Sequence, residues 1–266
     1  MKKFGLKGKV SFFSESIYKA VEKFGEIVKD TLISKYTYKY DEKGNMIEEN
    51  YYKSSELNSK TTYKYDEKGN EIEENEYRAD GSLRYKYTYK YDVKGNEIEY
   101  NKYNAIEVKS AIIEGIYCIN DGSLIYKETY EYDEKGNKIV WNFYNADGWW
   151  DGKLTHKYDE NGNNFETNTY DAYRSLSSKD TYEYDVKGNM IEHNRYRADG
   201  SLYYKYTYKY DVMGNMIEEN YYIAGGSLSS KYTYNYEFDA MGNWIKKTCI
   251  ANDKPKELIE RVIEYY

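Results

Sequence analysis

Cysteine, histidine and proline are scarce in this 266-residue chain, which has two cysteines, two histidines and one proline. Cys118 and Cys249 are too few for a disulfide framework and lack the spacing of metal ligands. His156 and His193 lie in different repeats, so they do not form a recognisable catalytic or metal-binding pair. We therefore expect no catalytic residue, no cofactor and no metal site, and we expect the protein not to be an enzyme.

Long apolar runs and blocks of one charge are also absent. No run approaches the roughly 20 apolar residues of a membrane-spanning helix, so no membrane span is predicted. The net charge is -7 with lysine and glutamate interleaved, which argues against nucleic-acid binding. Residues 1–10 lack a secretion signal, so the sequence predicts a cytoplasmic protein if complete, or an exported or cell-surface one if a signal was removed.

Tyrosine and glycine are abundant instead, with 38 and 19 residues, and mean hydropathy is -1.01. A buried face must therefore be largely phenolic. The motif Tyr-x-Tyr-Asp-x-x-Gly-Asn recurs about every 26 residues, with one longer interval between Gly95 and Gly136. Its glycines are Gly44, Gly69, Gly95, Gly136, Gly162, Gly188, Gly214 and Gly242.

Each repeat alternates with period 2, which indicates β-strands. Asp92 to Gly95 is typical of a type I turn with a glycine bulge, and it pairs Asp92 with Asn96 and Tyr91 with Glu97. A second turn, residues 78–82, pairs Tyr77 with Leu83. The register that we extrapolate from these turns places one set of side chains on a common face: Tyr87, Tyr89, Tyr91, Glu99, Asn101 and Tyr103.

Glutamates recur at one repeat position and are predicted to accept hydrogen bonds from the tyrosine hydroxyls of that face. They are Glu48, Glu73, Glu99, Glu166, Glu192 and Glu218. The predicted fold is all-β: tandem antiparallel hairpins that form one long twisted sheet, coiled into an open superhelix or tube with a tyrosine-lined face. Dimerisation through that face is the alternative.

The repeat divides the chain into five segments. Residues 1–33 are expected to form a divergent capping hairpin or a short helix, and residues 246–266 one or more capping strands. Regular repeats are expected over 34–103 and 121–245, and residues 104–120 form an irregular insertion.

Departures from the repeat are the candidate binding residues, because repeat packing explains the recurrent ones. Trp149 and Trp150 replace the usual Ser-Leu after a turn, and Trp141 lies on the preceding strand. The register predicts Trp150 on the tyrosine face, where packing is the main alternative to binding. Ile112 and Ile116 belong to the aliphatic insertion, which is either a packed loop or a binding loop.

The motifs at Tyr91 to Asn96 and Tyr77 to Gly81 resemble the YD repeats of the Rhs and teneurin proteins, most closely the short, tyrosine-rich bacterial variety. The likeness covers about residues 31–250. It implies hairpins that spiral into a shell around a toxin or form large surface proteins. The chain has too few repeats for a closed shell and no protease or toxin segment follows Tyr266, so we do not expect encapsulation here.

These observations favour a non-enzymatic repeat scaffold that binds a protein or has a structural role. A carbohydrate-binding surface module that uses Trp149 and Trp150 is the second hypothesis. The third, an immunity or antitoxin partner of a polymorphic toxin, rests on the family resemblance and the acidic charge.

Overall fold

The structure is a computed structural model and describes residues 4–104 and 123–266. The described residues form 18 β-strands. Their bounds are β1 Val10–Lys23, β2 Glu26–Tyr40, β3 Met46–Lys53, β4 Glu56–Tyr65, β5 Glu71–Arg78, β6 Leu83–Tyr91, β7 Glu97–Asn104, β8 Leu124–Tyr132, β9 Lys138–Asn145, β10 Trp150–Tyr158, β11 Asn164–Tyr170, β12 Leu176–Tyr184, β13 Met190–Arg197, β14 Leu202–Tyr210, β15 Met216–Ile223, β16 Leu228–Phe238, β17 Trp244–Ala251 and β18 Lys254–Tyr265. Within these ranges no helix is long and apolar enough to cross a membrane.

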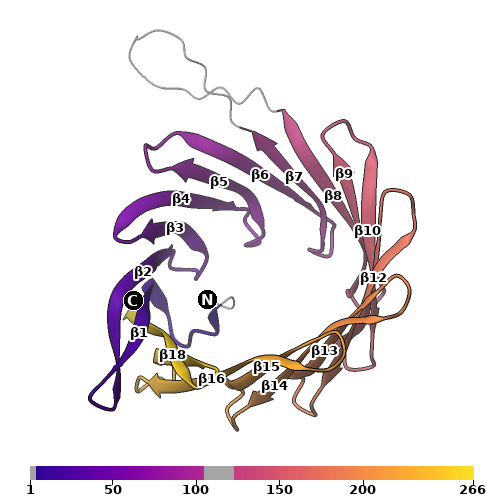
Figure 1. The fold of residues 1–266 in the computed structure, drawn as a ribbon. Helices are drawn as coiled ribbons and strands as arrows, with labels where there is room; N and C mark the ends of the chain where they lie inside the picture. Colours follow the sequence, from indigo (N-terminus) through magenta and orange to yellow (C-terminus); the bar gives the residue numbers. More distant parts are fainter. Residues whose placement is uncertain (1–3, 105–122) are drawn as a thin grey trace, which may run out of the picture. The chain divides into compact units, whose positions relative to one another are not determined.

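The strands belong to one 18-stranded antiparallel sheet in which sequence neighbours pair and β1 also pairs with β18. Figure 1 shows β1 beside β2 and β18. Phe13 lies opposite Ile263 and Ile17 opposite Ile259 in the closing ladder. The sheet is therefore a closed β-barrel in its connectivity, and our expectation of an open coiled sheet was wrong. Hydrogen bonding between the first and last strands removes the exposed edges that an open array would leave.

The chain forms two compact units. One contains Met1–Lys127, Tyr236–Thr248 and Lys256–Tyr266, and the other contains Glu128–Asn235 and Cys249–Pro255. The first unit has an aromatic core of Leu6, Val10, Phe13, Tyr38 and Tyr40, over which Phe4 packs. The second unit buries mainly polar side chains, among them Thr167, Ser178, Asp180, Asn194 and Asn220. Most of the buried side chains of this unit therefore carry hydrogen-bonding groups.

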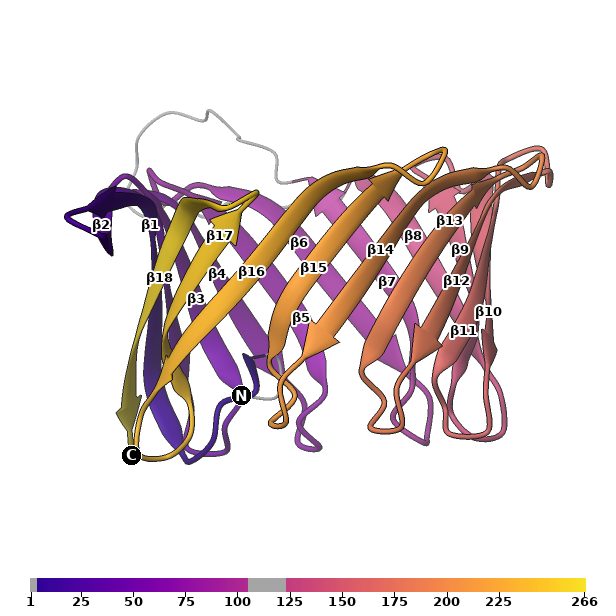
Figure 2. The ribbon, with the colours of Figure 1, turned by 60° about the horizontal axis from the view of Figure 1, so that its bottom comes forward.

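The two predicted turn pairings are confirmed. The amide of Asp92 donates to the carbonyl of Asn96 at 2.9 Å, and Tyr91 lies opposite Glu97. Tyr77 lies opposite Leu83 across the second turn. The two kinds of turn lie at opposite ends of the strands, as Figure 2 shows for β12 to β16.

The register beyond the turn differs from our prediction by one residue. Lys90 pairs with Glu99 and Tyr89 pairs with Tyr100, so Ile98 is the extra residue of a second β-bulge. A one-residue shift moves every following side chain to the other face. Glu99, Asn101 and Tyr103 therefore do not share a face with Tyr87 and Tyr89, as we had predicted.

The sheet consequently has two different faces. The tyrosine face carries Tyr85, Tyr87 and Tyr89 of β6 with Tyr100 of β7. The lysine–glutamate face carries the alternate residues, including Lys90 and Glu99. These two names are kept below.

The tyrosine hydroxyls find other partners than the predicted glutamates. The Tyr89 hydroxyl donates to Glu74 at 2.9 Å, and that of Tyr63 donates to Glu49 at 3.1 Å. In several hairpins the tyrosine before the turn instead donates to a main-chain carbonyl of the preceding hairpin, as Tyr91 does to Glu71 at 2.7 Å. The same bond recurs from Tyr65, Tyr158, Tyr184 and Tyr210. The tyrosine ladder thus links successive hairpins and does not depend on the glutamates that we had assigned to it.

Candidate functional site

A ladder of ion pairs runs along the lysine–glutamate face. The candidate site is the place where one ion pair of this ladder is missing. Glu166 of β11 lies between Lys157 of β10, at 2.8 Å, and Lys179 of β12, at 2.6 Å. Asn168 also donates to Glu166, at 3.0 Å. The hydrogen bonds from Lys157 and Lys179 lower the pKa of Glu166 to about 2. The same arrangement surrounds Glu48, Glu73, Glu99 and Glu218.

The ladder is interrupted at β9. Val140 occupies the position that is glutamate in the regular repeats, and it lies opposite Thr155 as Glu73 lies opposite Thr88. Lys153 of β10 occupies the position of Lys86 and Lys179, which pair with that glutamate. In the part of the chain that the structure describes, Lys153 forms no ion pair; its ammonium lies 5.2 Å from the centre of the Tyr170 ring.

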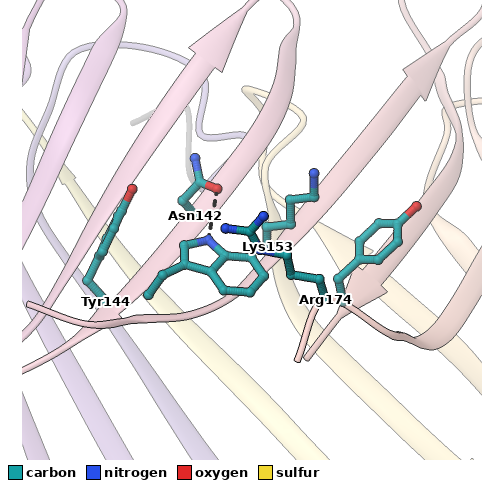
Figure 3. A pocket seen from close by; sticks show the side chains of 6 residues that line it. Asn142, Tyr144, Lys153 and Arg174 are labelled. Carbon is teal, nitrogen blue, oxygen red and sulfur yellow. Dashed lines mark hydrogen bonds between the residues drawn. The ribbon is translucent and has the colours of Figure 1, made fainter. Parts of the chain in front are cut away.

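Beside this interruption the same face is hollowed. A cavity of about 470 Å³ is lined by Asn142, Tyr144, Trp150, Lys153, Tyr170 and Arg174. These residues come from β9, from β10, from β11 and from the turn that follows it. Figure 3 shows Asn142, Tyr144, Lys153 and Arg174 around the opening. We call this cavity the Trp150 hollow.

The Trp150 indole is held in place from two sides. Its Nε1 donates to the Oδ1 of Asn142 at 3.3 Å, the interaction drawn as a dashed line in Figure 3. In the regular repeats the corresponding asparagine donates to the ladder glutamate, as Asn168 does. The Arg174 guanidinium lies 5.7 Å from the indole centre. Replacing the glutamate by Val140 therefore leaves both Asn142 and Lys153 available to the hollow.

Two more residues around the hollow differ from their equivalents in other repeats, and both affect the backbone. Arg174 stands where the equivalent turns have Gly81 and Gly200, and it keeps their left-handed conformation with φ of 66°. Gly152 is buried and occupies the place of Tyr85. A Cβ there would lie 2.7 Å from the Tyr170 carbonyl oxygen, so glycine permits the close approach of β10 to the end of β11.

Trp150 lies on the lysine–glutamate face, so its predicted place on the tyrosine face was wrong. It pairs with Tyr144, and the bulge at Asp151 reverses the alternation before Gly152 pairs with Phe143. Trp149 lies in the turn and is 73% exposed. Trp141 is on the tyrosine face, where it packs on Tyr130 and Phe143 and its Nε1 donates to Glu128 at 2.9 Å. Trp141 therefore does not join the other two tryptophans, and Ile112 and Ile116 lie outside the described residues.

The histidines lie apart from the hollow, both on the tyrosine face. His156 Nδ1 is 3.0 Å from the Thr167 hydroxyl, and burial lowers the pKa of this histidine. His193 stacks on Tyr182, and its Nε2 lies 2.7 Å from the Oδ1 of Asp180. Over residues 4–104 and 123–266 no group of three potential metal-ligating side chains is assembled.

Sequence reasoning missed Lys153, Arg174, Tyr144, Tyr170 and Val140. Val140 and Arg174 had a signal, because each replaces a residue that the repeat predicts at that position. Lys153, Tyr144 and Tyr170 match the repeat, and only the missing ion pair and the hollow distinguish them from their equivalents.

Comparisons with known proteins give no family. No protein-family model matches the chain, and no curated protein matches it. Among solved structures, a porin-like protein from Bacteroides uniformis aligns over 96% of both chains with 12% identity and a TM-score of 0.45. A porin-like protein from Bacteroides vulgatus covers 98% of this chain and 99% of its own, with 13% identity and a TM-score of 0.39.

A third structure, of TcdB2-TccC3, covers 85% of this chain with 14% identity and a TM-score of 0.36. The match spans 13% of that much longer chain. The cytoplasmic alternative that the first ten residues suggested is withdrawn, because two of these neighbours are described as porin-like. No function is transferred from similarities of this size.

Proposed function

We propose that the protein is a non-enzymatic scaffold that binds carbohydrate in the Trp150 hollow. The observation that carries the proposal is that two departures from the repeat, Trp150 and Arg174, line one cavity, while two more, Val140 and Gly152, lie on the β9 and β10 strands that form it. Repeat packing needs none of these replacements. Their meeting in one place supports a ligand site.

The lining suits a sugar ring. Trp150, Tyr144 and Tyr170 offer aromatic surface, and Asn142, Lys153 and Arg174 offer polar groups at its margin. A volume of about 470 Å³ is within the usual range for small-ligand sites. The face around the hollow carries rows of ion pairs, whereas the lipid-facing side chains of membrane barrels are apolar. We therefore take this face, and the hollow in it, to be in contact with water.

A neighbouring cavity supports a ligand longer than one sugar. Leu176, Lys179, Tyr196 and Gly200 line a hollow of about 320 Å³, and they are the repeat equivalents of Trp150, Lys153, Tyr170 and Arg174. We call it the Leu176 hollow. Equivalent positions are two strands apart, roughly 10 Å at about 4.8 Å per strand. That spacing fits a short oligosaccharide with successive units in the two hollows.

Replacing Trp150 tests the proposal. Trp150→Leu installs the usual repeat residue, so the fold should persist while the sugar loses its aromatic surface. We expect about a tenfold to hundredfold loss of affinity, measured by titration calorimetry with an oligosaccharide selected on a glycan array. Trp141→Phe, on the other face, is the matched control and should bind as the wild type does. Absence of any array signal with the folded wild-type protein would overturn the proposal.

Protein binding is the second candidate, favoured by two exposed aromatic side chains. Trp149 is 73% and Tyr173 is 89% exposed, in the turns that follow β9 and β11. Exposed aromatic residues of this kind are common interaction hot spots. A stoichiometric protein partner that is lost on Trp149→Ala and Tyr173→Ala but retained on Trp150→Leu would support it, and retention by all three variants would contradict it. The immunity role and a homodimer stay predictions from the sequence.

A further inference from the structure

The regular repeats show how the charge of the lysine equivalent to Lys153 is compensated elsewhere in the sheet. In the regular copies, the lysine equivalent to Lys153 forms an ion pair with a glutamate of the preceding strand. The pairs are Lys60 with Glu48, Lys86 with Glu73, Lys127 with Glu99, Lys179 with Glu166, Lys205 with Glu192 and Lys231 with Glu218. At each of these places the lysine charge is compensated within the sheet.

At the Trp150 hollow that compensation is missing. Val140 replaces the glutamate, and among the described residues neither Lys153 nor Arg174 is ion-paired with a carboxylate. Glu131 of β8, which stands where a ladder lysine such as Lys90 would be, is exposed and forms no described ion pair with Lys153. The hollow thus contains two cationic side chains, Lys153 and Arg174, and no carboxylate of the described chain forms an ion pair with either.

The positions of these cations define what can compensate them. The Lys153 ammonium lies 5.2 Å from the Tyr170 ring centre, and the Arg174 guanidinium lies 5.7 Å from the centre of the Trp150 indole. Each cation therefore lies beside an aromatic surface. A ligand that stacks a ring on Trp150 or Tyr170 brings a group on that ring within reach of a cation, and a planar carboxylate matches the guanidinium fork.

We infer that the Trp150 hollow binds an acidic sugar, with its carboxylate held by Lys153 and Arg174 and its ring against Trp150. The Leu176 hollow, whose Lys179 is already paired with Glu166, takes a neutral unit of the same chain. This inference rests on the proposed carbohydrate function and specifies the class of sugar. An acidic peptide would satisfy the same two cations, but the aromatic lining and the sugar-sized cavity favour a carbohydrate.

Val140→Glu is the decisive variant, because it restores the repeat residue beside Lys153 and should fold as the other copies do. The probes are an oligosaccharide that contains a uronic acid and its methyl ester, which differ in the negative charge and in one methyl group. We expect Val140→Glu to weaken binding of the acid about tenfold while the ester is unaffected, because the new carboxylate pairs with the Lys153 ammonium that would otherwise hold the acid. Lys153→Gln should act in the same direction. Lys231→Gln is the matched control, because Lys231 is the equivalent lysine of β16, is paired with Glu218 and lines neither hollow.

The outcomes separate this inference from the function on which it rests. If acid and ester bind the wild type equally, or Val140→Glu weakens both equally, the acidic class is wrong but carbohydrate binding stands. If neither sugar binds folded wild-type protein, the carbohydrate function itself is wrong. If only an acidic peptide binds, and Val140→Glu abolishes that binding, the cations are correctly assigned but the sugar is not. Circular dichroism and melting temperature establish that each variant is folded.

Discussion

The Trp150 hollow and the Leu176 hollow have the same backbone plan and different chemistry. Trp150, Lys153, Tyr170 and Arg174 of the first correspond to Leu176, Lys179, Tyr196 and Gly200 of the second. The Leu176 hollow keeps the repeat leucine, the turn glycine and a lysine paired with glutamate. The Trp150 hollow has lost all three features. In a repeat protein the regular copy shows what the fold requires, so the difference between two copies indicates what a site requires.

Among substitutions around the Trp150 hollow, we expect the largest change in stability at Gly152. Gly152→Ala would place a Cβ 2.7 Å from the Tyr170 carbonyl oxygen, at a backbone φ of 152° that L residues rarely adopt. We expect the free energy of unfolding to fall by roughly 2–3 kcal/mol, measured by urea denaturation. Ser230→Ala, at the equivalent position of β16, should change it by less than about 0.5 kcal/mol. A Gly152→Ala protein as stable as the wild type would show that β10 and β11 can separate freely at this point.

Arg174 provides an effect of intermediate size in the opposite direction. Arg174→Gly restores the turn residue of the other copies and removes the strain of a non-glycine residue at a positive φ of 66°. The free energy of unfolding should therefore rise by about 1 kcal/mol. Affinity for an acidic ligand should fall in the same variant. Gly200→Ala is the reciprocal change in the Leu176 hollow; no atom lies within 4 Å of the added Cβ, so it should cost about 1 kcal/mol through backbone strain alone. Equal stability of all three proteins in thermal melts would contradict this account.

The smallest expected effect is a pH dependence of the stability that Glu166 contributes. Val140, which replaces the ladder glutamate on β9, cannot contribute one. Hydrogen bonds from Lys157 and Lys179 lower the pKa of Glu166 from 4.5 to about 2 in the folded protein. A group whose pKa is lower when folded stabilises the protein above its unfolded pKa, and that contribution disappears as the pH falls toward the folded value. The stability contributed by Glu166 should therefore be complete above about pH 4.5 and decline toward pH 2.

Melting curves of Glu166→Gln and wild type between pH 2 and 7 measure this contribution. The difference in melting temperature should be present at pH 7 and shrink between pH 4.5 and 2. Glu160→Gln, in an exposed turn, is the control. A difference that stays constant over the whole range would mean that the ion pairs around Glu166 add nothing to stability, as many solvent-exposed pairs do.

Much of the local structure was predictable because it depends on a few consecutive residues. Asp92, Gly95 and Asn96 specify a turn through their own backbone and side-chain hydrogen bonds, so the pairing of Tyr91 with Glu97 followed from sequence. The bulge at Ile98 was not predictable in this way, because an isoleucine has no turn signature. Its recurrence at Ile47, Ile72, Ile191 and Ile217, with Phe165 in the same place, was the available signal.

The sequence by itself determined the repeat, the strands, the turns and the positions at which the repeat is broken. These properties arise from alternation and from short-range turn geometry. The tertiary structure decided three other things: the face on which the glutamates lie, the pairing of β1 with β18, and the meeting of Trp150, Lys153 and Arg174. Each depends on hydrogen bonds or contacts between separate strands, and a one-residue bulge is enough to reverse which side chains meet.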